Sequence, residues 1–190
     1  MIILVTGKSG SGKSTFAKVL SEKLGYKYID FDNVVHRMYE SDEFTKKVVL
    51  IFGNDILNNE GKVDRKKVGK IMFTTPTSKQ VLEYNDFSYK QMKKIIDSEM
   101  TKNTVLDYAL LPIYDYWNSD GIKVLVKAKD DNERIKRILK RDNISREYFL
   151  KRESASLDFE KYDYDFVIEN DYTINFEKGI ENLAKLIKKY

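Results

Sequence analysis

The sequence predicts an α/β fold in which helices flank a parallel β-sheet. Three features of the chain lead to this prediction. Short runs of apolar and β-branched residues alternate with longer segments of helical periodicity. The first apolar run passes through a glycine-rich turn directly into a helical pattern, and the chain ends in an amphipathic helical segment. Because alternating strands and helices form parallel sheets, we expect ligands to bind at the carboxyl ends of the strands.

The elements are predicted in chain order from these patterns. Strands are expected at residues 2–6, 27–30, 103–107, 122–127 and 165–168, where short runs are apolar or β-branched. Helices are expected at residues 13–24, 33–51, 65–72, 77–100, 130–141, 146–156 and 174–189. The helical stretch 33–102 is longer than an ordinary crossover between two strands, which indicates a region that lies beside the site.

Length and composition restrict the class of protein. The 190 residues suffice for one compact domain with a full hydrophobic core. The 34 Lys and Arg residues are interspersed with 30 Asp and Glu residues, and no basic tract stands out, so we expect no nucleic-acid partner. No run approaches the ~18 apolar residues of a membrane span, so we expect no membrane association.

The absence of cysteine excludes disulfides, thiolate zinc sites and cysteine nucleophiles. The first strand begins at the second residue, so we expect no signal peptide. Both features fit a cytoplasmic protein. We expect a monomer or a weak homo-oligomer that acts on a small-molecule substrate.

The most informative motif lies at the end of the first strand. Gly7, followed after four residues by Gly12-Lys13-Ser14, has the spacing of a phosphate-binding P-loop. Glycines let backbone N–H groups turn around an anion, and the next helix points its positive end at the same charge. Lys13 can then reach the terminal phosphates, and the Ser14 hydroxyl can bind Mg²⁺. The sequence therefore predicts a protein that binds a nucleoside triphosphate.

A second group of candidates follows the second strand. The strand ends at Asp30, and Asp32 begins the next helical pattern. A carboxylate at this edge could accept a proton from a substrate hydroxyl or orient Mg²⁺ through water. A helix N-cap is the alternative role for Asp32, and one side chain can serve both. His36 lies one turn further on, and a lone histidine is more often a structural residue.

Two further groups follow the third and fourth strands. Asp107 ends the third strand at a Walker-B-like position, and the aromatic residues after it are expected to pack against the sheet rather than on a base. In the helix after the fourth strand, Arg134, Arg137 and Arg141 are expected on one face, and Arg152 lies on the next helix. Such arginines either neutralise charge during phosphoryl transfer or serve solubility.

Taken in order, these motifs resemble the dephospho-CoA kinase family of P-loop kinases. The family pattern L-T-G-x-I-x-S-G-K-S-T is matched by residues 5–15, and I-D-A-D by residues 29–32. The closing A-D-x-V-I-D-N is similar to residues 164–170. The most specific match is to F-G-x-x-I-L-x-x-x-G-x-I-D-R-x-x-L-G-x-x-V-F, with these residues in register: Phe52, Gly53, Ile56, Leu57, Gly61, Val63, Asp64, Arg65, Val68, Gly69, Met72 and Phe73.

The resemblance implies a three-layer P-loop fold in a single domain, residues 1–190, with a helical acceptor-side region at about 33–102 and a lid at about 142–158. It implies that ATP, with Mg²⁺, phosphorylates the ribose 3′-hydroxyl of dephospho-CoA in the last step of CoA biosynthesis. By position, Asp32 is the general base, with Lys13 and Arg141 as further catalytic residues. The nucleotide set is Gly7, Ser9, Gly10, Ser11, Gly12, Lys13, Ser14, Thr15, Arg137, Arg141, Arg152 and Asn170; Ser14 also binds the metal, and the acceptor set is Asp32, His36, Arg65 and Asp107.

Two stretches depart from the family pattern, both on the acceptor side. The family usually has a His-Pro pair where this chain has Phe87 and Ser88. After the third strand it has D-x-P-L-L-x-E, whereas here the proline is displaced and Ile113 replaces the glutamate. A related kinase that acts on another nucleoside or small alcohol is therefore the alternative. A GTPase switch would carry an N-K-x-D motif, which this chain lacks, and a degenerate binder would have lost Lys13 or Ser14.

Overall fold

The computed structural model describes residues 1–154 and 156–189. Residue 155, which falls in the predicted lid, and residue 190 lie outside the described residues. The chain forms two compact units: residues 1–30 with 100–190, and residues 31–99.

The first unit is built on a parallel sheet. Among the described residues its strands are β1 (Ile2–Thr6), β2 (Lys27–Asp30), β3 (Thr104–Asp107), β4 (Ile122–Ala128) and β5 (Phe166–Asn170). They are arranged in the order β2-β3-β1-β4-β5, and all four pairings are parallel. The five predicted strands are confirmed to within two residues at each end. Since β1 lies between β3 and β4, the strand order reverses there, which favours a ligand site at its carboxyl end.

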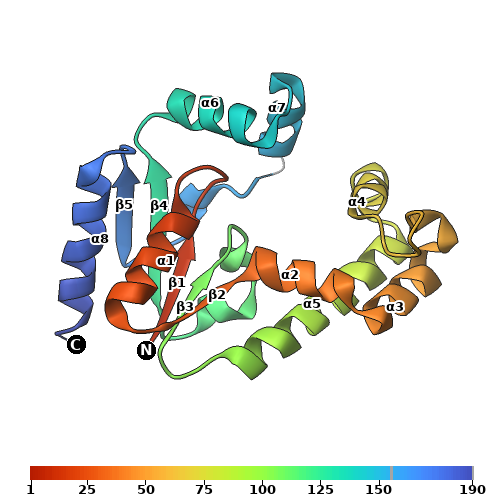
Figure 1. Ribbon diagram of the computed structural model, residues 1–190, viewed down its shortest axis with the longest axis horizontal. Helices are drawn as coiled ribbons and strands as arrows, with labels where there is room; N and C mark the ends of the chain where they lie inside the picture. Colours follow the sequence, from red (N-terminus) through yellow and green to blue (C-terminus); the bar gives the residue numbers. More distant parts are fainter. Residues whose placement is uncertain (155, 190) are drawn as a thin grey trace. The chain divides into compact units, whose positions relative to one another are not determined.

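Helices α1 (Lys13–Leu24) and α8 (Ile174–Ile187) cover one face of this sheet (Figure 1). The alternation of side chains along β1 points Ile3 and Val5 into the same core as Phe16 and Ile180. The short 3₁₀ turns Leu111–Ile113 and Asp115–Asn118 follow β3. Trp117, in the second of these turns, is buried and packs edge-on against Tyr164, with ring centroids 5.6 Å apart, and its neighbour Tyr116 is buried as well.

In the described part of the connection from β4 to β5, there are two helices and a 3₁₀ turn. They are α6 (Asp131–Asp142), α7 (Arg146–Ser154) and the turn Phe159–Lys161. Asp130 caps α6, and its carboxylate accepts the backbone N–H groups of Asn132 and Glu133.

The second unit is helical. Its elements are α2 (Phe31–Glu40), α3 (Asp42–Phe52), the 3₁₀ turn Asn54–Ile56, α4 (Arg65–Thr74) and α5 (Lys79–Glu99). Its buried side chains include Val34, Met38, Phe44, Val48, Ile51, Val81, Tyr84, Met92 and Ile96. Within residues 1–154 and 156–189, no helix has the length and apolar character that crossing a membrane requires.

The prediction of one helix over residues 33–51 is wrong. Ser41 interrupts it with an extended backbone, and its hydroxyl accepts the N–H of Phe44 at the start of α3. Asp42 and Glu43 fill the first turn of α3, where carboxylates favour the positive end of a helix. A serine cap followed by two acids therefore begins a new helix.

Candidate active site

The glycine-rich loop between β1 and α1 needs its glycines for two reasons. Gly10 and Gly12 adopt φ angles of +76° and +91°, a region that residues with a Cβ rarely enter. A Cβ atom on Gly12 would lie 2.2 Å from Asn170 Nδ2, and one on Gly10 would lie 2.6 Å from Ile138 Cγ1. The loop leads into Lys13, the first residue of α1, so the free N–H groups of that helix end face the loop.

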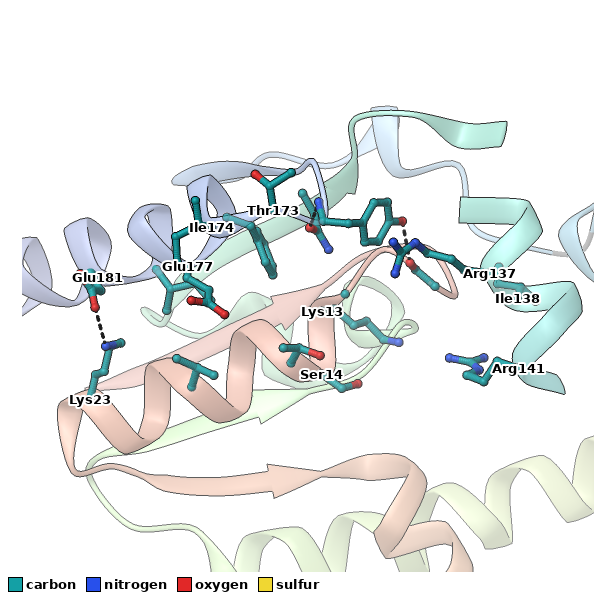
Figure 2. Close-up of a pocket in the computed structure, with 18 residues that line it drawn as sticks. Lys13, Ser14, Lys23, Arg137, Ile138, Arg141, Thr173, Ile174, Glu177 and Glu181 are labelled. Atoms are coloured by element: carbon teal, nitrogen blue, oxygen red, sulfur yellow. Dashed lines mark hydrogen bonds and ion pairs between the residues drawn. The ribbon is translucent and has the colours of Figure 1, made fainter. Parts of the chain in front are cut away.

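A cavity of about 680 Å³ opens beside this loop, between α1, α6 and the start of α8. Figure 2 shows Lys13 and Arg141 reaching into the same opening from α1 and α6. The predicted nucleotide-binding residues that line it are Gly10, Gly12, Lys13, Ser14, Thr15, Arg137, Arg141 and Asn170. Ser9 and Arg152 instead line a neighbouring cavity of about 110 Å³. The loop and the two arginines of α6, Arg137 and Arg141, thus line the same cavity.

Asp107 lies at the carboxyl end of β3, in register with Asp30 on β2. It is buried, and its Oδ2 accepts the Tyr28 hydroxyl at 2.9 Å. Burial raises the pKa of Asp107 above its usual range, an effect that Lys13 and a hydrogen bond from Ser14 oppose. The resemblance placed Asp107 on the acceptor side, whereas its neighbours in the first unit are Lys13 and Ser14.

Two of the predicted arginines meet on one carboxylate. Arg141 Nε lies 2.6 Å from Asp142 Oδ1, and Arg152 Nη1 lies 3.5 Å from Asp142 Oδ2. A hydrogen bond from Arg141 is the largest of the effects that lower the pKa of Asp142. Arg137 lies with its guanidinium 4.2 Å from the centre of the Tyr172 ring and its Nε 3.0 Å from Glu133.

Arg134 was predicted on one face with Arg137 and Arg141, but it is buried whereas the other two are exposed. It is 1% exposed and bonds Asp131, Glu153 and the backbone oxygen of Ser9. Burial alone would lower the pKa of Arg134, but the hydrogen bonds to Asp131 and Glu153 outweigh it and raise that pKa, so the side chain stays charged.

Asn170 ends β5 and is buried against the loop. Its Nδ2 donates to the Ser11 backbone oxygen at 2.9 Å, and its Oδ1 accepts the Tyr172 N–H at 2.8 Å. The resemblance placed Asn170 among the residues that bind the nucleotide. In the structure its side-chain amide holds the glycine-rich loop.

The comparisons with known proteins agree with this geometry. The family model for dephospho-CoA kinase matches residues 1–175. A dephospho-CoA kinase of Fusobacterium nucleatum subsp. nucleatum is 32% identical, over 100% of this chain and 96% of that protein. The chain belongs to the dephospho-CoA kinase family. This confirms the family that the order of the motifs predicted, and with it a nucleotide-binding P-loop kinase.

Solved structures place this family member in the same fold. A crystal structure of a Thermus thermophilus protein superposes with a TM-score of 0.80 at 25% identity, covering 96% of this chain and 95% of that one. A dephospho-CoA kinase from Campylobacter jejuni superposes with a TM-score of 0.61 at 24% identity, covering 98% and 96%. The predicted α/β P-loop fold is therefore confirmed.

In this dephospho-CoA kinase family member, three acceptor-side candidates lie in the second unit. Asp32 and His36 are exposed on α2, one turn apart and thus on the same face. Arg65, the first residue of α4, places its Nη1 2.8 Å from His36 Nε2 and its guanidinium 5.3 Å from the centre of the Tyr39 ring. Asp32 is the second residue of α2, inside the first turn, and does not occupy the N-cap position.

The positions that depart from the family pattern have apolar or exposed surroundings in this family member. Phe87 stacks on Phe44 within the second unit, with ring centroids 5.4 Å apart. The Ser88 hydroxyl is buried, and within the described part of the chain it has no hydrogen-bond partner. Ile113, in the place of the glutamate, is 55% exposed.

The sequence did not indicate the residues that complete the cavity from the far side. These are Tyr172, Thr173, Ile174, Phe176 and Glu177, at the turn into α8 and its first residues. The apolar spacing of this segment marks a core helix, and Phe176 indeed packs against Phe16 in the core, with ring centroids 6.2 Å apart. Only the topology, which sets β5 beside β4, brings this turn next to the P-loop.

Proposed function

We propose that this chain transfers the γ-phosphate of ATP to the ribose 3′-hydroxyl of dephospho-CoA, giving CoA and ADP. Membership of the dephospho-CoA kinase family supports the acceptor, because the family model spans residues 1–175. The cavity lined by Lys13, Ser14 and Arg141 supports the donor. The match over nearly the whole chain is the observation that carries the proposal.

In this proposal the reaction is an in-line displacement at the γ-phosphorus. The 3′-oxygen bonds to phosphorus while Asp32 accepts its proton, and the bond from that phosphorus to the bridging oxygen of ADP breaks. Loop amides and Lys13 hold the phosphates. Arg141 and Arg152 leave Asp142 to neutralise the charge that develops on the transferred group. The exposure of Asp32, two residues beyond the end of β2, supports its role as base.

The residues present fit a bound Mg²⁺. Asp107 Oδ1 is buried and, among the described residues, without a hydrogen-bond partner, while Ser14 is a hydrogen-bond neighbour of the same carboxyl. Ser14 would hold the ion directly and Asp107 through water, and the ion would offset the negative charge of the phosphates. Residues 1–154 and 156–189 contain no group of three His, Cys, Asp or Glu side chains placed to hold a metal. An ion held mainly by phosphates and water does not require such a group.

The remaining assignments belong to the same proposal. The helices of residues 31–99 form the acceptor side, with Asp32, His36 and Arg65 toward dephospho-CoA. Residues 142–158 form a lid that excludes water when it closes. The proposed location is the cytoplasm, which the cysteine-free sequence supports, and the proposed state is a monomer or weak homo-oligomer.

The test is direct. Purified protein is incubated with ATP, Mg²⁺ and dephospho-CoA, and the formation of CoA is followed by mass spectrometry. Lys13→Ala should abolish CoA formation, because it removes the side chain that reaches the terminal phosphates.

At Phe87 and Ile113 the chain differs from the family pattern on the acceptor side. These differences favour a second candidate function, a kinase for another nucleoside or small alcohol. A panel of such acceptors is therefore assayed under the same conditions. A higher kcat/KM for one of them, with no turnover of dephospho-CoA, would refute the proposed acceptor.

A further inference from the structure

Three successive carbonyl groups of the glycine-rich loop accept hydrogen bonds from side chains outside the loop. Arg134 Nη1 donates to the Ser9 oxygen at 2.9 Å. The Tyr172 hydroxyl donates to the Gly10 oxygen at 2.9 Å, and Asn170 Nδ2 donates to the Ser11 oxygen at 2.9 Å. Arg134 belongs to α6, Asn170 ends β5, and Tyr172 lies in the turn between β5 and α8, so two separate parts of the chain hold the loop.

The direction of these bonds determines where the loop amides point. In a peptide plane the C=O and the N–H of the next residue point in opposite directions. In an anion-binding concavity the N–H groups face the anion and the oxygens face outward. Side chains that hold the oxygens of three successive peptide planes therefore fix the N–H groups that follow. Those of Gly10 and Gly12 are the ones that can face an anion, because the Ser11 N–H donates to the Lys8 oxygen at 3.1 Å within the loop. A loop fixed in this way loses little freedom when an anion binds.

The backbone of Tyr172, beside the glycine-rich loop, is strained. Its φ angle is +58°, and among the described residues Asn143 is the other non-glycine residue with positive φ. Asn143 ends a helix, where the left-handed conformation is usual. Tyr172 does not end a helix. Its conformation is held by two hydrogen bonds, from its N–H to Asn170 Oδ1 and from its hydroxyl to the Gly10 oxygen. Backbone strain that neighbours hold in place gathers at functional sites.

The charge of Arg134 is already balanced by other partners. Its guanidinium bonds Asp131 at 2.7 Å and Glu153 at 2.7 Å, and Glu153 also lies 3.3 Å from Lys8. A buried guanidinium with two carboxylate partners adds little net attraction for a phosphate. Its contribution at the loop is therefore geometric, through the Ser9 oxygen.

We propose that Arg134, Asn170 and Tyr172 are positioning residues for the triphosphate, acting by holding the loop carbonyls outward so that the loop amides stay turned toward the phosphates. This inference rests on the nucleotide binding in the proposed function and is independent of the acceptor. Tyr172 offers the cleanest test, because Tyr172→Phe removes one hydroxyl and keeps the ring beside Arg137.

The chain supplies a matched control. The Tyr164 hydroxyl donates to the backbone oxygen of Phe159 at 2.9 Å, the same kind and length of bond, but its acceptor does not belong to the glycine-rich loop. Affinities for Mg-ATP and for inorganic tripolyphosphate are measured by titration calorimetry, with melting temperatures for each variant. Tyr172→Phe should weaken both ligands by about three- to tenfold, the range expected for one lost hydrogen bond. Tyr164→Phe should lower the melting temperature about as much as Tyr172→Phe does and leave both affinities unchanged.

Three other results would overturn the inference. If Tyr172→Phe binds tripolyphosphate as tightly as the wild type does, Tyr172 has no positioning role. If the variant loses affinity for ATP alone, Tyr172 contacts the adenine ring and not the phosphates. An equal loss of affinity in Tyr164→Phe means that general stability is responsible. If the wild-type protein binds ATP but forms no CoA, the proposed acceptor fails while the positioning role stands.

Discussion

At the scale of single residues, the role of Asp32 is open to a clean test. Asp32→Asn keeps the shape of an exposed side chain in the first turn of α2 and removes its basicity. We predict that kcat for CoA formation falls by about a hundredfold or more, since a positioned base contributes at least that much. The affinity for Mg-ATP and the melting temperature should stay close to those of the wild type, because exposed substitutions change stability little.

A neighbouring helix provides the control for this substitution. Asp42 is an exposed acid in the first turn of α3, as Asp32 is in α2, so Asp42→Asn makes the same chemical change at an equivalent helical position. Its kcat should match that of the wild type. Undiminished turnover by Asp32→Asn would remove Asp32 from the role of base.

Asp107 is a residue at which function and stability should oppose each other. Burial raises its pKa above the ordinary value of 3.8, so the ionised carboxylate destabilises the folded protein at neutral pH. We predict that Asp107→Asn raises the melting temperature of the ligand-free protein at pH 7. The same variant should lose most of the stabilisation that Mg-ADP gives, because the carboxylate that would orient Mg²⁺ is gone.

The pH dependence follows from the direction of that pKa shift. A raised pKa in the folded state means that the favourable contribution of Asp107 is complete below pH 3.8 and is lost as the pH rises through the folded-state pKa. The melting temperature of Asp107→Asn minus that of the wild type should therefore be positive at pH 7 and shrink toward pH 4. A difference that grows on acidification would contradict this account of Asp107.

At the scale of elements, local patterns were sufficient for the strands and insufficient for one helix break. The strands and the P-loop are short runs whose residue types determine their conformation, so the sequence predicted them within two residues. The break at Ser41 also had a local signal, a serine followed by two acids, but the continuing apolar period obscured it. The burial of Arg134 had no local signal, since it depends on Glu153, 19 residues further along the chain.

The ion pairs of Asp142 lead to a prediction about α6 and α7. Asp142 pairs with Arg141 and Arg152, so phosphates must compete with it for both. We predict that Asp142→Asn lowers the KM for ATP several-fold. The melting temperature should change little, since ion pairs between exposed side chains contribute about 0–1 kcal/mol.

The matched control removes another ion pair of the same region. Glu147 pairs with Lys151 at 3.0 Å on the exposed surface of α7. Glu147→Gln therefore changes the charge of α7 and leaves the ion pairs of Arg141 and Arg152 intact. Its KM for ATP should equal that of the wild type. A raised KM in Asp142→Asn would mean that Asp142 aims the arginines at ATP and does not compete with it.

At the scale of the whole molecule, the order of motifs along the chain predicted the family, because the match runs in register through both units. The cavity wall from α8 could not be predicted, since sequence periodicity reports which face of a helix is buried and not which loop it meets. The helical region predicted at residues 33–102 nearly coincides with the compact unit 31–99. Its assignment to the acceptor rests on the family resemblance and on the pairing of His36 with Arg65.

Hydrogen exchange followed by mass spectrometry can test that assignment, because a ligand protects the amides of the unit it binds from local opening. We predict that Mg-ADP protects residues 7–15, α6 and the turn after β5, all in the first unit. Dephospho-CoA alone should protect the starts of α2 and α4, where Asp32, His36 and Arg65 lie. Lys13→Ala should lose the first protection and keep the second. Protection of the second unit by Mg-ADP alone, with none from dephospho-CoA, would reverse the assignment of ligands to units, because each ligand can slow exchange only where its own contacts hold the chain closed.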